Sequence, residues 1–184
     1  MSRSRDAEYT EYVAARLPSL RRLAMVLCDD GQRADDLVQA ALTKMYVHWS
    51  RVREVSHADA YARAVLVHEF LHERRSAWAR RVSLSGGVTD PPVAALDHDA
   101  VLDLRAAVAA LPPRQRATLV LRFYCDLSVD QSAETLGCSP GTVKSQTTRA
   151  LAAVRRALGP EHAASRQASA PRRWDSTSTG SDRP

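Results

Sequence analysis

The stretch from residue 128 to residue 143 reads SVDQSAETLGCSPGTV and has the pattern of two helices joined by a tight turn. Ser128 followed by Gln131 matches the capping box that begins a helix. Gly137 can take the left-handed conformation that ends such a helix at little steric cost. Ser139-Pro140 then supplies an N-cap and a proline for the first turn, so a second helix is predicted to start at once.

Two helices joined so closely cross at a steep angle, and the residue at the crossing must be small. Ala133 meets that demand, and the spacing of Ala133, Gly137 and Val143 is typical of a DNA-binding helix-turn-helix. The second helix has no acidic residue from 141 to 158, as a helix in a negatively charged groove requires. The predicted DNA-facing side chains are Thr142, Lys144, Ser145, Gln146, Thr148 and Arg149. The alternative is an ordinary helical hairpin, but its solvated face usually mixes Glu with Lys or Arg.

The composition of the 184 residues also favours an all-helical protein with a nucleic-acid partner. The chain has no isoleucine, which favours strands, and is rich in Ala, Leu, Arg and Glu, which have high intrinsic helix propensity. Of 26 basic residues only two are lysine, and the net charge is +5.

Three widely spaced cysteines argue against a disulfide framework or a thiolate zinc site. No apolar signal segment or membrane span is recognisable, so we expect a cytoplasmic protein.

Helical periodicity organises the rest of the chain. One amphipathic helix is predicted from its apolar positions Ala34, Leu37, Val38, Ala41, Leu42, Met45 and Trp49. Pro18 is expected to divide residues 8–28 into two short helices. A longer helix is predicted over residues 57–81, with its apolar side at Ala64, Val67, Leu71 and Trp78. Periodicity resumes at residue 99, and Pro112-Pro113 separates one helix from the next.

The pattern predicts two small helical domains and two irregular segments. Residues 6–82 form the first domain, and residues 83–98 have the composition of a flexible linker. Residues 99–158 form the second domain, which contains the helix-turn-helix. Residues 159–184 are rich in Ser, Arg, Ala and Pro, and we expect them to be disordered.

One short motif suggests a different chemistry. His68-Glu69-Phe70-Leu71-His72 matches the H-E-x-x-H signature of zinc metalloproteases. Arg75, however, is predicted on the same helix face, where its cation would oppose the metal. The downstream candidates for a third ligand, Asp90, Asp97 and His98, lie in or just after the predicted linker. We therefore expect no metal site.

Both predicted domains resemble parts of one protein family. LPPRQR at 111–116, LVLRFY at 119–124 and LGCSPGTVKS at 136–145 resemble region 4 of bacterial sigma-70-type sigma factors. ADDLVQAAL at 34–42 is similar to the core-binding helix of their region 2. The order of the two regions, with only a short linker between them, resembles the extracytoplasmic-function (ECF) group, most like its actinobacterial sigma-E-type members.

The resemblance assigns a role to each predicted surface. The helix-turn-helix would read the −35 promoter element. The following residues would bind the coiled coil of the polymerase β′ subunit: Asp35, Asp36, Leu37, Gln39, Met45, Tyr46 and Trp49. The next set would open and hold the −10 element: Tyr61, Arg63, His68, Arg74, Arg75, Trp78, Arg80 and Arg81. The family pattern often has Asn where His68 stands.

The resemblance therefore implies an RNA polymerase sigma factor that directs core polymerase to promoters and aids strand opening in transcription initiation. Its expected partners are core RNA polymerase, through the β′ and β subunits, and promoter DNA, with an anti-sigma factor left open as a third. No cofactor and no enzymatic activity of its own are expected, nor any membrane association. Two other classes stay open at this point: a stand-alone helix-turn-helix regulator and the metalloprotease.

Overall fold

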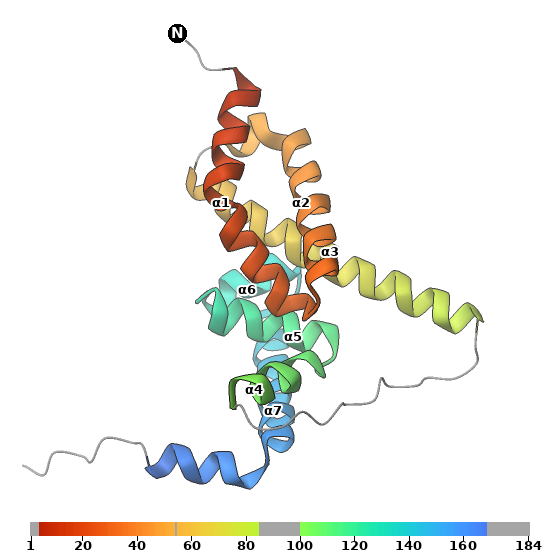
Figure 1. Cartoon of the computed structure of the whole chain (residues 1–184), viewed down its shortest axis with the longest axis vertical. Helices are drawn as coiled ribbons and strands as arrows, with labels where there is room; N and C mark the ends of the chain where they lie inside the picture. The colour runs from red at the N-terminus through yellow and green to blue at the C-terminus, as the bar shows by residue number, and fades with distance from the viewer. Residues whose placement is uncertain (1–3, 54, 85–99, 169–184) are drawn as a thin grey trace, which may run out of the picture.

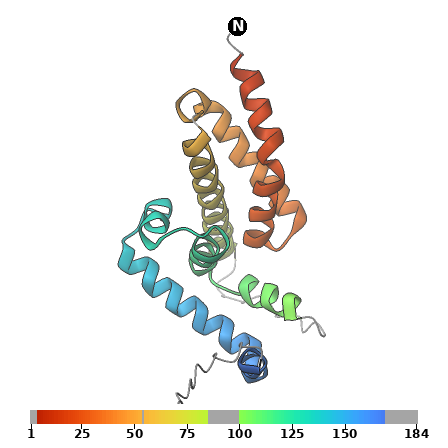
Figure 2. The same cartoon turned by 90° about the vertical axis from the view of Figure 1, so that its left-hand side faces the viewer.

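The computed structural model describes residues 4–53, 55–84 and 100–168, with side chains described for 4–53, 58–74 and 103–159. Every regular element in these ranges is a helix, as the sequence predicts. The N-terminal helices form the upper part of the molecule in Figures 1 and 2, and the C-terminal helices form the lower part. Most of the predicted linker, the side chains of Arg75, Trp78, Arg80 and Arg81, and residues 169–184 lie outside the described parts.

The N-terminal half consists of α1 (Arg5–Cys28), α2 (Gly31–Val52) and α3 (Val55–Leu84). A tight corner joins the first two helices, because Asp29 takes a left-handed conformation and Asp30 caps α2 by accepting from the Arg33 N–H. The three helices share an apolar core, whose members include Leu23, Leu27, Leu37, Met45, Trp49, Leu66 and Phe70. This core positions both the α2 surface and the α3 surface predicted above.

One prediction about these helices is wrong, and another is only partly confirmed. Residues 8–28 form one continuous helix, with Pro18 inside it. Pro18 is exposed, so water can solvate the carbonyl that its missing N–H leaves free, while the buried stripe of Leu20, Leu23 and Leu27 continues past it. In α3 the predicted apolar side is right at Val67, which is fully buried, but Ala64 and Leu71 are only half-buried. Ala62, Leu66 and Phe70, which the prediction left out, are fully buried, and the Trp78 side chain lies outside the described parts.

The C-terminal half consists of α4 (Ala100–Ala109), α5 (Pro113–Leu119), the π-helical turn η1 (Val120–Tyr124), α6 (Val129–Leu136) and α7 (Pro140–Ala168). The capping box is formed as predicted, because Ser128 Oγ accepts from the Gln131 N–H and Gln131 Oε1 accepts from the Ser128 N–H. Gly137 ends α6 with a φ of 61°.

The last helix is longer than the sequence suggested. We expected disorder from residue 159, but α7 bends at Gly159, which has a φ of 71°, and continues to Ala168. The segment after the bend, EHAASRQA, contains good helix formers, and most of the Pro and Ser residues of the predicted tail come after it.

The two halves pack against each other, which the sequence did not predict. Ala117 and Val120–Leu121 belong to the same apolar cluster as the core of the N-terminal half. A second, smaller cluster joins α4 and α5 to α7 through Ala107, Leu111, Leu119, Ala150 and Val154. Within the described parts of the chain, no helix is long and apolar enough to span a membrane.

Candidate nucleic-acid and protein interfaces

The second helix of the helix-turn-helix is anchored on one face and exposed on the other. Val143 and Ala150 are fully buried, and Ala133 is buried where α6 and α7 cross, as predicted. Ser132 beside it is equally buried, a small residue that the sequence did not single out. The anchored face fixes the direction in which the opposite face points.

Between residues 142 and 149, the exposed face of α7 presents two long cations and several short polar groups. Lys144, Ser145, Thr148 and Arg149 are exposed, and Thr142 and Gln146 are half-buried. Two hydroxyls bond to their own helix, since Ser145 Oγ donates to the Thr142 carbonyl and Thr148 Oγ1 to the Lys144 carbonyl. Lys144 and Arg149 are therefore the groups with the longest reach toward a bound polyanion.

The predicted polymerase surface of α2 is smaller than expected. Asp36, Gln39 and Tyr46 are exposed and Asp35 is half-buried. In contrast, Leu37, Met45 and Trp49 are at most 4% exposed and form part of the core, so they cannot act as anchors for a partner. Trp49 packs against the rings of Tyr9 and Tyr12 at centroid distances of 5.2 and 5.0 Å. Val47, which the sequence reading passed over, is 63% exposed on this helix.

The charges on this α2 surface are held by specific partners. Arg21 Nε lies 2.6 Å from Asp35 Oδ1, and this hydrogen bond holds the pKa of the Asp35 carboxyl below its usual value. Tyr46 donates from its hydroxyl to Asp6 at 2.9 Å, which raises the pKa of the phenol. Asp36 contacts only a neutral amide among the hydrogen bonds found here, from Gln32 at 3.3 Å. Asp36 is thus the carboxylate most available to a basic partner.

The predicted −10 residues of α3 have varied surroundings. Tyr61, Arg63 and Arg74 are half-buried, and His68 is exposed. The Tyr61 ring meets the His48 ring edge-on at 6.3 Å, and the Arg74 guanidinium lies 5.7 Å from the centre of the Phe70 ring. These four residues lie on one helix, α3. The side chains of the other four predicted residues, Arg75, Trp78, Arg80 and Arg81, lie outside the described parts.

Two residues of the H-E-x-x-H motif, His68 and Glu69, form polar contacts with other helices. His68 Nε2 lies 2.6 Å from the carbonyl oxygen of Thr135, and Glu69 forms an ion pair with Lys44 at 2.5 Å. Among the described side chains, no three His, Cys, Asp or Glu residues lie together where they could hold a metal ion. Two of the three groups of the motif, His68 and Glu69, therefore make other contacts in this fold, while His72 is exposed.

Arg116 links the two halves and was missed as an individual residue by the sequence reading. Its Nη1 donates to the Leu27 carbonyl at 2.8 Å, and its guanidinium lies 5.9 Å from the centre of the Phe70 ring. Loss of solvation lowers the pKa of Arg116 to about 10, so the side chain is still charged at neutral pH. Only the position of this arginine in the motif LPPRQR hinted at a role.

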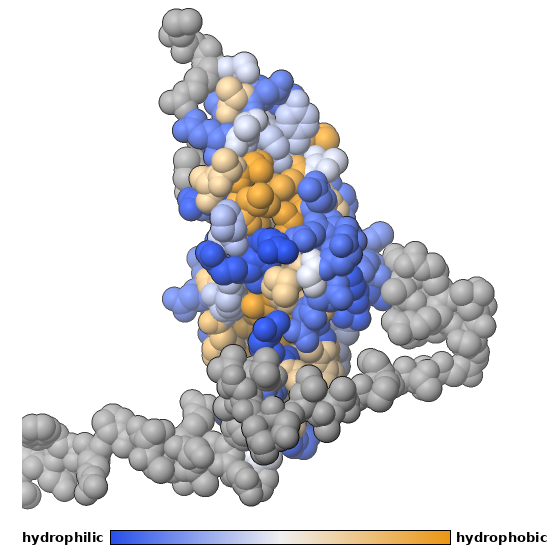
Figure 3. Space-filling view, in the orientation of Figure 1, coloured by the Kyte–Doolittle hydropathy of each residue, from blue (hydrophilic) through white to orange (hydrophobic). Residues whose placement is uncertain are grey.

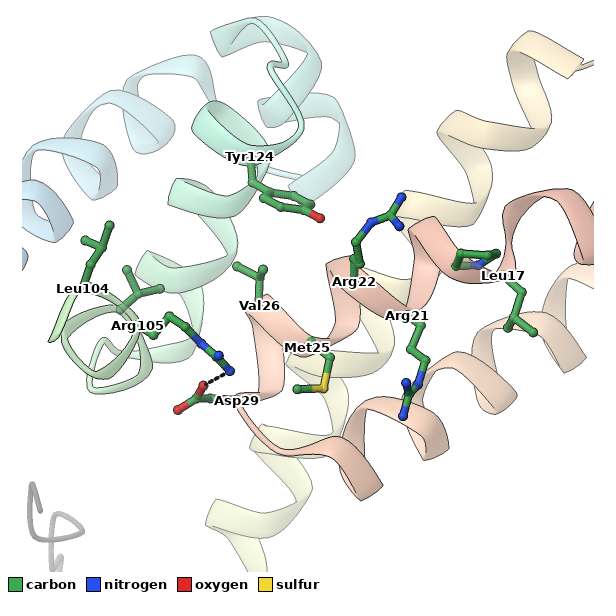
Figure 4. A pocket seen from close by; sticks show the side chains of 11 residues that line it. Leu17, Arg21, Arg22, Met25, Val26, Asp29, Leu104, Arg105 and Tyr124 are labelled. Carbon is green, nitrogen blue, oxygen red and sulfur yellow. Dashed lines mark hydrogen bonds and ion pairs between the residues drawn. The ribbon is translucent and has the colours of Figure 1, made fainter. Parts of the chain in front are cut away.

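Two hollows lie between the halves. The first, of about 800 Å³, is bounded by α1, α4 and Tyr124, and Figure 4 shows Leu104 and Arg105 of α4 on one side of it and Met25 and Val26 of α1, with Asp29 just after that helix, on the other. The second, of about 770 Å³, lies between α3 and the helix-turn-helix and is lined by His68, His72, Gln146 and Arg149, among others. The face of the molecule drawn in Figure 3 is largely hydrophilic, with an apolar area over α1 and α2.

Comparison with known proteins gives matches for both halves. The model of sigma-70 region 2 matches residues 12–80, and that of sigma-70 region 4 matches residues 102–154. The RNA polymerase sigma-E factor of Streptomyces coelicolor is 36% identical over 157 residues, which is 82% of this chain and 86% of that protein. The ECF RNA polymerase sigma factor SigL of Mycobacterium tuberculosis is 32% identical over 161 residues, covering 83% and 87%.

A solved structure is similar over both halves. The sigma factor RpoE of Bartonella quintana, in complex with the anti-sigma factor NepR, superimposes with a TM-score of 0.66 at 28% identity. The match covers 82% of this chain and 96% of that chain.

Proposed function

Because the chain belongs to the ECF group of sigma-70-type RNA polymerase sigma factors, we propose that its two halves divide promoter recognition between them. As a sigma factor it binds core RNA polymerase and promoter DNA. Residues 6–82 dock on the polymerase and open the −10 element, and residues 99–158 read the −35 element. The observation that carries this division is the exposed, acid-free face of α7, combined with an exposed acidic surface on α2.

The −35 element is read by Lys144 and Arg149 with the shorter groups Thr142, Ser145, Gln146 and Thr148 around them. A cation that meets a base edge contributes specificity, and one that meets phosphate contributes position and salt dependence. The exposure of Lys144 and Arg149, on a helix whose other face is buried, supports this assignment.

The polymerase is bound by the exposed part of the α2 surface, Asp35, Asp36, Gln39 and Tyr46. The −10 element is held by Tyr61, Arg63, His68 and Arg74, and we retain Arg75, Trp78, Arg80 and Arg81 for the same role. Aromatic and cationic side chains suit unpaired bases and their phosphates. The chain supplies no covalent chemistry of its own, acts in the cytoplasm, and is open to capture by an anti-sigma factor.

Run-off transcription tests the proposal. Core polymerase with this chain is expected to start at a defined subset of a genomic promoter library, whereas core polymerase alone starts at none of them. A stand-alone regulator would neither co-purify with core polymerase nor create start sites. Absence of both signals for a folded chain would contradict the proposal.

A further inference from the structure

The hollow of about 770 Å³ between α3 and the helix-turn-helix gathers basic side chains from three helices. The basic residues that line it are His68, His72, Arg74, Arg114 and Arg149. Among the described residues of this lining the one acid is Glu69, whose carboxylate is already paired with Lys44 at 2.5 Å. Positive groups brought together around one concave site repel each other and attract an anion. We propose that this hollow is a binding site for a nucleoside polyphosphate.

Three of the basic side chains are available to phosphate groups. Arg114 in the first turn of α5, Arg149 in α7 and His72 in α3 are all exposed. Within the described parts of the chain, none of these three side chains forms a hydrogen bond or an ion pair. A guanidinium group binds phosphate through two parallel N–H bonds, which are stronger than bonds between neutral groups. Donors from three helices suit a run of phosphates better than a single one.

The rest of the lining suits a nucleobase. Leu71, Pro113 and Leu136 are half-buried and provide an apolar surface on which a flat ring can pack. Gln115 and Gln146, also half-buried, carry amide groups that both donate and accept, as the polar edge of a base requires. A ligand that has a ring as well as phosphates therefore uses both kinds of lining residue.

The size of the hollow separates this ligand from double-stranded DNA. Small-molecule sites have volumes of about 300–1,000 Å³, and the hollow of about 770 Å³ falls within that range. His68 donates from Nε2 to the Thr135 carbonyl at 2.6 Å and so joins α3 directly to α6. Because this contact bridges the walls, a duplex cannot pass between them, whereas a nucleotide fits beside it.

The site shares residues with the surface proposed for the −35 element. Gln146 and Arg149 line the hollow and also belong to that DNA-facing set. A bound nucleotide therefore competes with the duplex for these two side chains. This consequence rests on the function proposed above, whereas binding of the nucleotide itself does not.

Isothermal titration calorimetry of the full chain, without divalent cations, tests the site with ATP, GTP and sodium tripolyphosphate. We expect at least one nucleotide to bind at one site per chain, and tripolyphosphate to bind at least tenfold more weakly because it lacks a base. His72→Ala and Arg114→Ala should each weaken nucleotide binding about tenfold, as loss of one hydrogen bond to a charged group does. His48→Ala and Arg156→Ala are the matched controls, exposed residues outside the hollow, and should bind as the unmodified chain does.

Three results would overturn the proposal. They are no binding of either nucleotide to a chain that circular dichroism shows to be helical, equal binding of tripolyphosphate, and an equal loss of binding in the control variants, which would indicate attraction to a basic protein in general. Because the four substituted residues are exposed, the variants are expected to fold.

Competition with a labelled random-sequence duplex tests the shared residues. The nucleotide should weaken duplex binding to the unmodified chain about tenfold, and should do so much less for Arg114→Ala, which keeps the whole DNA-facing set. Duplex binding that the nucleotide leaves unchanged would remove Gln146 and Arg149 from the site. None of these results touches the proposed function, since run-off transcription by core polymerase with this chain tests that separately.

Discussion

Lys144 and Arg149 are the two side chains on which promoter reading depends most directly. We expect Lys144→Ala and Arg149→Ala each to weaken −35 binding by about 1–3 kcal/mol where the side chain contacts a base, and to flatten the salt dependence where it contacts phosphate. Fluorescence anisotropy over a salt series separates the two cases. Arg51→Ala, an exposed arginine on α2, is the control. An unaltered transcript level from the double variant would refute the assignment.

Gly137 shows how a single residue shapes the reading surface. Its φ of 61° is strained for any side chain with a Cβ, although nothing lies within 4 Å of where that Cβ would be. Gly137→Ala is therefore expected to lower the free energy of unfolding by about 1 kcal/mol through backbone strain alone. Gly141→Ala lies inside α7 and should be neutral or stabilising. Urea denaturation compares them, and equal effects would contradict the explanation.

At the scale of the element, α1 tolerates a proline that the sequence reading treated as a boundary. Pro18→Ala restores a backbone hydrogen bond within the helix, and we expect it to raise the free energy of unfolding by about 1–2 kcal/mol. Pro140→Ala is the matched control, because in the first turn of α7 the missing N–H has no helical partner. In thermal denaturation, Pro18→Ala should have a higher midpoint than the unmodified chain, and Pro140→Ala should not. A fall in that midpoint would mean that Pro18 stabilises α1.

The exposed surface of α2 carries the next prediction. Asp36→Arg reverses the charge at its most available carboxylate, so it should reduce co-purification with core polymerase while helicity is unchanged. Thr10→Arg adds a cation at an exposed position of α1 and controls for net charge alone. Equal recovery of Asp36→Arg and the unmodified chain would remove α2 from the polymerase interface.

At the scale of the whole molecule, the sequence predicted the helices better than their arrangement. Local signals such as the Ser128 capping box and the Gly137 cap depend on neighbouring residues and were confirmed. Periodicity identified the apolar side of α2 but not what covers it, so Met45 and Trp49 were assigned to a partner as well as to the core. The Arg116 contact joins residues 89 positions apart, and no local pattern encodes such a pairing.

The shared cluster also predicts how the molecule unfolds. Because Ala117, Val120 and Leu121 pack in the core of the other half, we expect one cooperative thermal transition for the free chain. Arg105→Glu places a second acid beside Asp29, with which Arg105 forms an ion pair between the halves, so it should broaden this transition or divide it in two. Calorimetry of the unmodified chain and of Arg105→Glu measures the number and width of the transitions. Hydrogen exchange in α2 and α7 compares the opening of the two halves. Two well-separated transitions in the unmodified chain would show that the halves are energetically independent.

The hollow between α1 and α4 has walls from both halves and therefore exists only while the halves are packed together. A small molecule that filled it would bind that conformer alone, and thermodynamic linkage turns such selectivity into a bias on the equilibrium. At a hundredfold excess over its dissociation constant it would stabilise this packing by about 2.7 kcal/mol. Such a compound would act at a site distinct from the exposed face of α7.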